Sequence, residues 1–201
     1  MINIAVLVSG GGTNLQALID AQNNGVIKSG KIALVISSNE NAYALERAKN
    51  VSIKSEVINK NDFNSEDEFD DALLNTLNEN DINLVVLAGY MTILSSKVVK
   101  AFKNRIINVH PSLIPSFCGD GFYGLKVHEE ALRRGVKVTG ATVHFVTEIC
   151  DGGPILAQKA VEVFDNDTPK TLQERVMKEC EWILLPKTTE KVCQLIEKGE
   201  I

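Results

Sequence analysis

Short apolar runs alternate with helical patterns from the start of this chain, and this alternation restricts the fold more than any other feature. Residues 2–8 form an almost unbroken apolar run that ends at Ser9 and three glycines, as expected of a strand buried on both faces. Residues 14–22 follow with leucine and isoleucine at helical spacing. The same alternation predicts further strands over residues 31–36, 52–57, 83–88 and 105–110, and helices over residues 42–49 and from Ser65 onward.

This order of elements indicates βαβ units and a parallel sheet, in which the loops at the carboxyl ends of the strands form a binding crevice. Two β-rich runs, residues 138–146 and 155–163, flank Asp151-Gly-Gly-Pro154 and predict a hairpin at one edge. Pro169 is expected to open a long helix, which Pro186 should kink or divide. The sequence thus predicts an α/β fold, with a Rossmann-like, mostly parallel sheet, helices on both faces and an antiparallel edge hairpin.

Length, charge and cysteine usage narrow the class of protein. The 201 residues fit one domain, and a formal charge of −5 without a basic stripe makes nucleic acid an unexpected partner. There is neither a signal peptide nor an apolar run of about 20 residues, so no membrane association is expected. Four cysteines without a CxxC pair indicate free thiols and a cytoplasmic location. A monomer or a homodimer is expected.

The segment Ser9-Gly-Gly-Gly-Thr-Asn14 joins the first predicted strand to the first predicted helix. Glycines let a phosphate approach the backbone closely, and the free amides of a helix start point toward it. A dinucleotide fingerprint would need a glycine where Leu15 stands and an acidic residue after the second strand, where Ser37-Ser38-Asn39 stands. Two interpretations remain open, a cradle for one phosphate and a tight turn without a ligand.

Asn108 and His110 lie at the end of an apolar strand, where side chains alternate between faces. Both therefore point the same way, with Cα atoms about 7 Å apart, while Ile107 and Val109 point to the opposite face. Polar groups in such a run must be hydrogen-bonded or face the crevice. An asparagine amide can donate to a developing oxyanion, and a histidine can transfer a proton near neutral pH. In isolation such a pair is more often structural than catalytic.

Asp151-Gly-Gly-Pro154 is by itself an ordinary turn. If that turn folds over the crevice, Asp151 can pair with His110, and its charge is expected to raise the pKa of His110. No metal site is expected, because the three histidines and the cysteines lack ligand spacing. A serine nucleophile is not indicated either, since there is no GxSxG elbow.

Five sequence blocks run in order over nearly the whole chain: Ser9-Gly-Gly-Gly-Thr-Asn-Leu15, Leu87-Ala-Gly-Tyr-Met-Thr-Ile-Leu94, Asn108-Val-His-Pro-Ser-Leu-Ile-Pro115, Val143-His-Phe-Val-Thr147 and Asp151-Gly-Gly-Pro154. Taken together, these blocks resemble the folate-dependent formyltransferases, and among them those that act on glycinamide ribonucleotide. The resemblance implies transfer of a formyl group from 10-formyltetrahydrofolate, as cosubstrate, to the primary amine of that nucleotide in purine synthesis.

The resemblance also implies roles for the residues of the site. Asn108 and His110 would stabilise the oxyanion of the tetrahedral intermediate, with His110 also in proton transfer. Asp151 would hold His110 in its useful charge state and help a water relay protons. Glu181 would contact the glycinamide or ribose end, unless it is a solvated helix glutamate. Phosphate binding would fall to Gly12, Thr13 and Asn14.

The same resemblance divides the chain into a phosphate- and nucleotide-binding half, residues 1–100, and a catalytic and folate-binding half, residues 101–201. The folate pocket would be lined largely through backbone groups. Its residues would be Met91, Thr92, Ile93, Leu94, Asn108, Thr147, Glu148, Ile149, Cys150 and Asp151.

Several positions depart from some members of the family. Glu66 and Thr92 stand where those members carry arginines that can meet anionic groups, which leaves recognition of the folate's glutamate tail open. Residues 116–124 form a longer, glycine-richer loop, either a lid over the nucleotide or a plain connection. Cys150 is expected to be a buried apolar side chain and not a nucleophile.

Other functions share parts of this pattern. A 10-formyltetrahydrofolate hydrolase would use the same asparagine, histidine and aspartate, but is expected to carry an additional N-terminal domain. A formyltransferase for methionyl-tRNA would carry a further C-terminal domain and a basic surface. A formyltransferase for another amine, or a nucleotide-binding module without catalysis, are the remaining alternatives.

Overall fold

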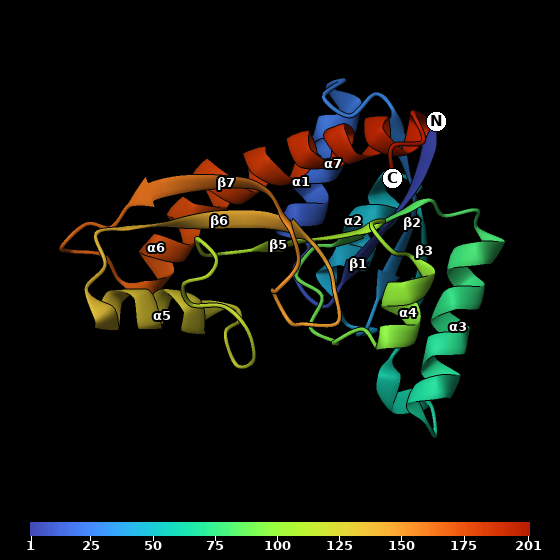
Figure 1. Cartoon of the computed structure of the whole chain (residues 1–201), viewed down its shortest axis with the longest axis horizontal. Helices are drawn as coiled ribbons and strands as arrows, with labels where there is room; N and C mark the ends of the chain where they lie inside the picture. Colours follow the sequence, from blue (N-terminus) through green and yellow to red (C-terminus); the bar gives the residue numbers. More distant parts are fainter.

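One seven-stranded sheet, in the order β3-β2-β1-β4-β5-β6-β7, runs through the whole molecule (Figure 1). The computed structural model describes all residues from Met1 to Ile201. Five strands, β3, β2, β1, β4 and β5, are parallel to one another. The pairs β5–β6 and β6–β7 are antiparallel, so the predicted edge hairpin is confirmed. The strands are β1 (Ile2–Val8), β2 (Gly30–Ser37), β3 (Lys54–Val57), β4 (Leu84–Leu87), β5 (Ile106–His110), β6 (Val138–Phe145) and β7 (Ile155–Glu162).

Two of the helices begin at the capping signals found in the sequence, whereas the fourth and fifth helices were not predicted. The Ser65 side chain accepts a hydrogen bond from the Glu68 amide at the start of the third helix, and Thr168 caps the sixth, with Pro169 at its first position. The helices are α1 (Thr13–Asn23), α2 (Tyr43–Asn50), α3 (Glu66–Glu79), α4 (Ser96–Ala101), α5 (Leu125–Arg134), α6 (Pro169–Val176) and α7 (Trp182–Glu197), with a 3-10 turn at Lys60–Asp62 and a π-helical segment at Met177–Glu181.

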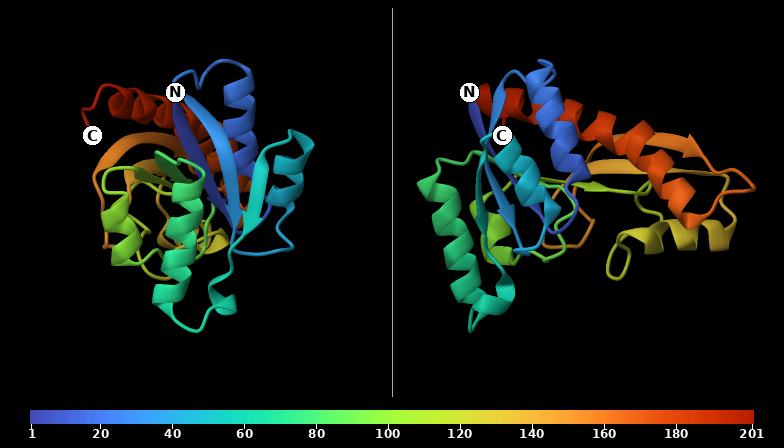
Figure 2. Two further views of the ribbon diagram at one scale, coloured as in Figure 1. Left: turned by 90° about the vertical axis from the view of Figure 1, so that its right-hand side faces the viewer. Right: turned by 180° about the vertical axis from the view of Figure 1, so that it is seen from behind.

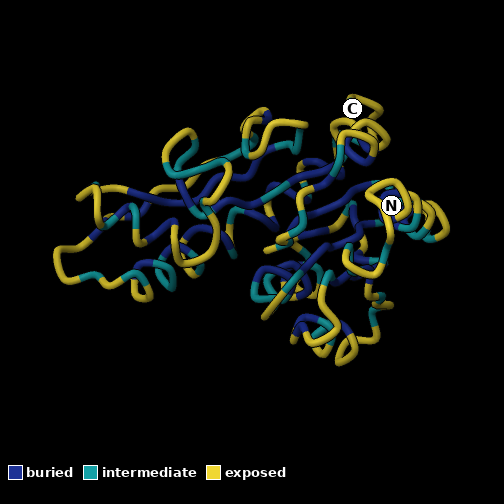
Figure 3. Tube along the Cα trace, turned by 90° about the horizontal axis from the view of Figure 1, so that it is seen from below, coloured by how far each residue is buried: buried dark blue, intermediate teal, exposed yellow.

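Alternation along the central strands produces two hydrophobic cores, one on each face of the sheet. Ile4 and Val6 of β1 pack in the core beneath α1, α2, α6 and α7, whereas Ala5 and Leu7 pack against α3 and α4. Both layers of helices are visible in Figure 2, and the central strands form the buried middle of the tube in Figure 3. This double burial explains why β1 and β4 are apolar at every position but one.

The β6–β7 hairpin extends beyond the parallel part of the sheet, with α5 and α6 packed together beside it (Figure 1). The two chain ends lie close together at the opposite end of the molecule, where the terminal amine of Met1 is 3.2 Å from the Glu197 carboxylate. None of the helices has the length and apolar character needed to cross a membrane.

Pro186 does not divide the helix, which was one of its two predicted effects. The helix that starts at Pro169 is interrupted by the π-helical segment Met177–Glu181, and Pro186 lies inside the continuous helix α7. Proline has the backbone φ of a helix and costs mainly one hydrogen bond, to the carbonyl of Trp182 four residues earlier. That carbonyl is in the first residue of α7, directly after the irregular turn, where the helical ladder is already interrupted.

Candidate functional site

A cleft of about 520 Å³ opens at the carboxyl end of β5, a volume typical of small-molecule sites. Three loops form its walls: the loop after β4, the loop before α5 and the loop between β6 and β7. Asn108, His110, His144 and Asp151 all line this cleft. The structure therefore brings together the three side chains to which the sequence analysis assigned catalysis, and adds a second histidine.

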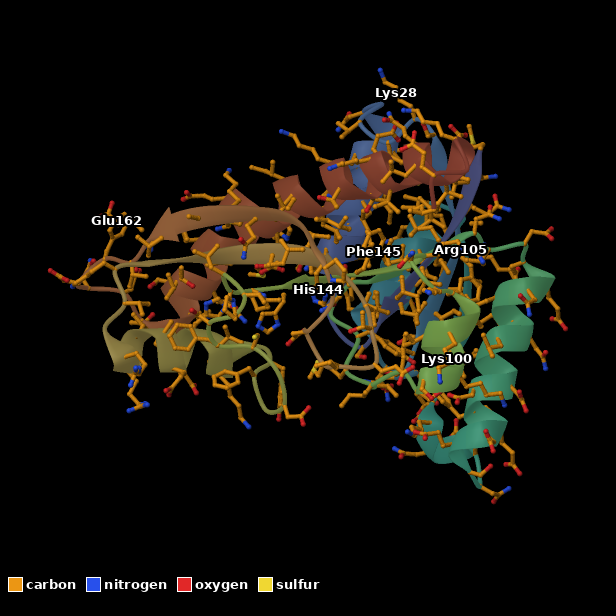
Figure 4. The ribbon with its side chains drawn as sticks, viewed as in Figure 1. Lys28, Lys100, Arg105, His144, Phe145 and Glu162 are labelled. Atoms are coloured by element: carbon orange, nitrogen blue, oxygen red, sulfur yellow. The ribbon has the colours of Figure 1, made fainter.

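The antiparallel register of β5 and β6 places His144 directly opposite Asn108. His144 Nδ1 lies 2.8 Å from the Phe145 carbonyl oxygen, which can only accept, so Nδ1 donates to it, while Nε2 lies 3.5 Å from Asp151 Oδ1. The Asn108 amide nitrogen lies 3.3 Å from that Nε2 and 3.5 Å from Asp151 Oδ1. Both contacts are long, so the Asn108 amide is oriented in the cleft but is not held by a strong partner. Figure 4 shows His144 and Phe145 side by side near the centre of the molecule.

His110 is held between the loop before α5 and the aspartate. Its Nε2 lies 2.8 Å from the Phe117 carbonyl oxygen and must donate to it, which leaves Nδ1 as the basic atom of the neutral ring. Nδ1 lies 3.4 Å from Asp151 Oδ2, and only 5% of the His110 surface is exposed. The nitrogen of the neutral ring that can accept a proton is therefore Nδ1, on the side that faces Asp151.

The expected rise in the pKa of His110 is corrected by its burial. Burial disfavours the imidazolium and lowers the pKa below the ordinary value of 6.5, and the Asp151 charge opposes this shift without outweighing it. Asp151 behaves in the opposite way. Burial disfavours its charge, but His144, His110 and the Gly119 amide together lower the pKa of the carboxyl. At neutral pH the site therefore pairs a neutral histidine with an ionised aspartate.

The turn that carries Asp151 depends on its glycines and on a left-handed backbone. Asp151 has φ +51°, a conformation that aspartate tolerates better than most side chains. A Cβ on Gly153 would overlap the carbonyl oxygen of Phe145, so only glycine fits there. Asp151 Oδ2 also accepts the Gly119 amide at 2.9 Å, which ties this turn to the loop before α5. That loop, residues 116–124, thus lies against His110 and Asp151.

The glycine loop after β1 is an array of unsatisfied donors. None of the backbone amides from Gly10 to Leu15 has a protein acceptor, and Gly12 begins helix α1 with φ +69°. Consecutive free amides at a helix start are suited to an anion. The loop follows β1, which is separated from β5 only by β4, so the predicted phosphate site and the cleft share one edge of the sheet.

Asn14 and Glu181 form a buried pair beside this loop. The Asn14 amide nitrogen donates to Glu181 Oε2 at 2.7 Å, and Asn14 Oδ1 is buried without a partner. Glu181 is 6% exposed and closes the π-helical segment, so its interpretation as a solvated helix residue was wrong. Burial raises the pKa of Glu181, and Asn14 only partly offsets this. One hydrogen of the Asn14 side-chain amide is bonded to Glu181, whereas the Asn14 backbone amide has no protein acceptor and is available to a phosphate.

The structure places every residue of the predicted folate pocket around the same cleft, and their role in binding stays a prediction. Cys150 is exposed, so its predicted burial was wrong. Although the residue is exposed, nearby protein atoms shield part of the thiol from water, and this desolvation, followed by the charges of Asp151 and Asp120, raises the pKa of the thiol. The thiol is therefore not an activated nucleophile. Glu66 does not line the cleft and pairs with Lys60 at 2.6 Å. The ten residues of the predicted folate pocket, all of which line the cleft, are Met91, Thr92, Ile93, Leu94, Asn108, Thr147, Glu148, Ile149, Cys150 and Asp151.

Two histidines near the cleft, His144 and His128, were given no functional role from the sequence. His144 stands in the Val143–Thr147 block, but only the strand register reveals that it faces Asn108. His128, in α5, is fully buried and neither ring nitrogen has a partner. Burial, followed by the nearby His110, lowers the pKa of His128 to about 4. No group of three or more metal-ligating side chains occurs in the structure.

The buried His128 should make the fold sensitive to acid. In the unfolded chain its pKa is near 6.5, whereas in the fold it is about 4, so the unfolded state takes up the proton first. The free energy of unfolding should therefore fall by about 3 kcal/mol from this group as the pH drops from 6.5 to 4. Urea unfolding at pH 7.5 and 4.5 measures this, and His128→Leu should lose about that part of the decrease. An identical decrease in both proteins would contradict the assignment.

The chain is similar in sequence and in structure to known formyltransferases. The formyl transferase family matches residues 2–189. The phosphoribosylglycinamide formyltransferase of Haemophilus influenzae is 42% identical over 92% of this chain and 84% of its own length. The human trifunctional purine biosynthetic protein adenosine-3 is 43% identical over 98% of this chain, which spans only 19% of that relative. The crystal structure of glycinamide ribonucleotide transformylase 1 from Symbiobacterium toebii superposes with a TM-score of 0.90 at 42% identity, covering 96% of this chain and 88% of that one.

Proposed function

The chain belongs to the formyl transferase family, and we propose that it transfers a formyl group from 10-formyltetrahydrofolate to the amine of glycinamide ribonucleotide in purine synthesis. The observation that carries this proposal is the meeting of the Asn108 amide, the His110 imidazole and the Asp151 carboxylate in one cleft, beside a loop of free amides. The cleft residues provide the oxyanion donor and the base that formyl transfer needs. The free amides account for an acceptor that carries a phosphate.

The cleft has the character needed for the folate. Its walls combine apolar side chains such as Leu94 and Val146 with the backbone of the loops after β4 and β6. A flat heteroaromatic ring is bound by such a combination, because apolar contact supplies affinity and a few polar groups set the orientation. The folate supplies the activated formyl carbon, and its nitrogen is the leaving group.

The residues of this chain would divide the work as follows. As the amine attacks the formyl carbon, charge develops on the formyl oxygen, and the Asn108 amide donates to it. The amine must lose a proton and the folate nitrogen must gain one when the carbon–nitrogen bond to the folate breaks. His110 Nδ1 accepts the proton that the amine loses, and the neighbouring Asp151 carboxylate stabilises the imidazolium that forms. The imidazolium then gives this proton to the folate nitrogen as the carbon–nitrogen bond breaks.

On the acceptor side, the amides of Gly12, Thr13 and Asn14 would bind the ribose 5-phosphate, and Glu181 would contact the glycinamide or ribose end. The division into a nucleotide-binding half and a catalytic half belongs to this proposal. A cytoplasmic site of action is also proposed, supported by the four free thiols.

The pH dependence of the rate tests the role of His110. Because its pKa lies below 6.5 and the neutral ring is the base, kcat/KM should fall as the pH drops through that pKa. Asp151 raises the pKa of His110, so Asp151→Asn should move this acidic limb to lower pH, besides lowering the rate. The measurement is kcat/KM from pH 4.5 to 9 for both proteins. A limb that moves to higher pH, or does not move, would refute the coupling.

An assay of the purified protein with 10-formyltetrahydrofolate, with and without glycinamide ribonucleotide, tests the function itself. Folate turnover that requires the nucleotide, with formylated nucleotide as product, is the expected result. Formate release without the nucleotide would instead show a hydrolase. Turnover with a different amine, and none with this nucleotide, would replace the acceptor but keep the family chemistry.

A further inference from the structure

The Ser9 hydroxyl joins the ends of three neighbouring strands. Ser9 directly follows β1, and its Oγ lies 2.6 Å from Ser38 Oγ, at the end of β2. The same oxygen accepts the Met91 amide at 2.8 Å, from the loop after β4. Backbone pairing of these strands stops just before this point. Its last bonds run from the Ser38 amide to the Val8 carbonyl and from the Ala88 amide to the Leu7 carbonyl.

Both loops that carry the proposed substrates start from this hydroxyl. The glycine loop begins with the next residue, Gly10, and ends at Asn14. Met91 lies within the segment from Gly89 to Leu94 that lines the cleft. Among the backbone amides of residues 89–94, the Met91 amide is the only one with a protein acceptor. Ser9 is therefore the hydrogen-bonded anchor of the loop on the folate side.

We propose that Ser9 is a positioning residue, which sets the phosphate-binding loop and the folate-facing loop at the distance that the reaction needs. This rests on the proposed function, because it assigns one substrate to each loop. Ser9 does not line the cleft, so it acts through the backbones of Gly10 and Met91. Two reactants must be held within a fraction of an ångström of their reacting geometry, and a displacement of about 1 Å can cost about 100-fold in rate.

The hydrogen-bonding capacity of the two serines provides a matched control. A hydroxyl has one proton and two lone pairs, so Ser9 can accept the Met91 amide and exchange a second bond with Ser38. Ser9→Ala removes both bonds, whereas Ser38→Ala removes only the second. Ser9→Thr keeps the hydroxyl. If the Met91 contact carries the effect, Ser9→Ala should be impaired while Ser38→Ala and Ser9→Thr stay close to the wild type.

The experiment compares these four proteins by hydrogen exchange of the Met91 amide, by kcat and KM for both substrates, and by thermal unfolding. Ser9→Ala should exchange the Met91 amide at least about tenfold faster, because that amide loses its acceptor. Its kcat should fall about 10- to 100-fold while each KM stays within about threefold, because binding is kept and alignment is lost.

Two results would overturn the inference. One is Met91 exchange that Ser9→Ala leaves unchanged, because Ser9 then does not anchor the loop. The other is wild-type kcat in Ser9→Ala, or an equal loss of kcat in Ser38→Ala. A wild-type protein without nucleotide-dependent transfer would overturn the proposed function. In that case Met91 exchange, which needs no turnover, still decides whether Ser9 holds the loop.

Discussion

Replacement of His110 by alanine is expected to lower kcat by about 100- to 10,000-fold, the usual contribution of a positioned acid–base group. The base at Nδ1 disappears, while the cleft walls and the glycine loop remain, so KM for either substrate should change only a few-fold. Steady-state kinetics of both proteins at pH 7.5 measure this. A larger KM at wild-type kcat would mean that His110 binds substrate but transfers no proton.

His110→Gln is the matched control for this experiment. A glutamine amide can still donate to the Phe117 carbonyl, as His110 Nε2 does, but it cannot accept a proton. We therefore expect a loss of kcat similar to that of His110→Ala, with the loop before α5 still held against the cleft. If His110→Gln keeps most of the wild-type rate, the histidine acts by positioning that loop and not by proton transfer.

Replacement of Gly12 by valine should remove nucleotide binding and also destabilise the fold. Gly12 has φ +69°, and a Cβ there would lie 2.7 Å from Ala44 Cβ and 2.9 Å from Ala44 Cα in α2. Left-handed strain of about 1–2 kcal/mol and overpacking of about 1–3 kcal/mol should together lower the free energy of unfolding by about 2–5 kcal/mol. Urea unfolding and calorimetric titration with glycinamide ribonucleotide measure the two effects.

Two glycines elsewhere separate these causes. Gly135 has the same φ of +69° but no atom within 4 Å of an added Cβ, so Gly135→Val reports the backbone strain alone. At Gly11 the φ is not left-handed and the space is open, so Gly11→Ala should keep stability within about 0.5 kcal/mol. We nevertheless expect it to weaken nucleotide binding about tenfold or more and to spare the folate, because it adds a methyl group to the loop of free amides proposed to bind the phosphate. Equal loss of both ligands would refute a separate phosphate site.

Much of the architecture was predictable because it is encoded locally. The apolar run of residues 2–8 and the capping signal at Ser65 depend on neighbours in sequence, and the first strand and the third helix form where they were expected. The interruption at Met177–Glu181 was not predictable, and Pro186 indicated the wrong place. Glu181, which ends this π-helical segment, is buried against Asn14, a contact across 167 residues that no local pattern reveals.

The candidate site divides in the same way. Strand alternation alone put Asn108 and His110 on one face, and the sequence motifs alone resembled the formyltransferases. Only the tertiary structure decided that His144 stands opposite Asn108, that Asp151 reaches His110 and that Ser9 holds Met91. It also reversed the expected shift in the pKa of His110, because desolvation depends on every element packed around the ring. Secondary structure could be predicted because hydrophobic periodicity and capping involve residues only a few positions apart. Strand register, side-chain burial and the resulting pKa shifts could not, because they depend on contacts between segments far apart in the sequence.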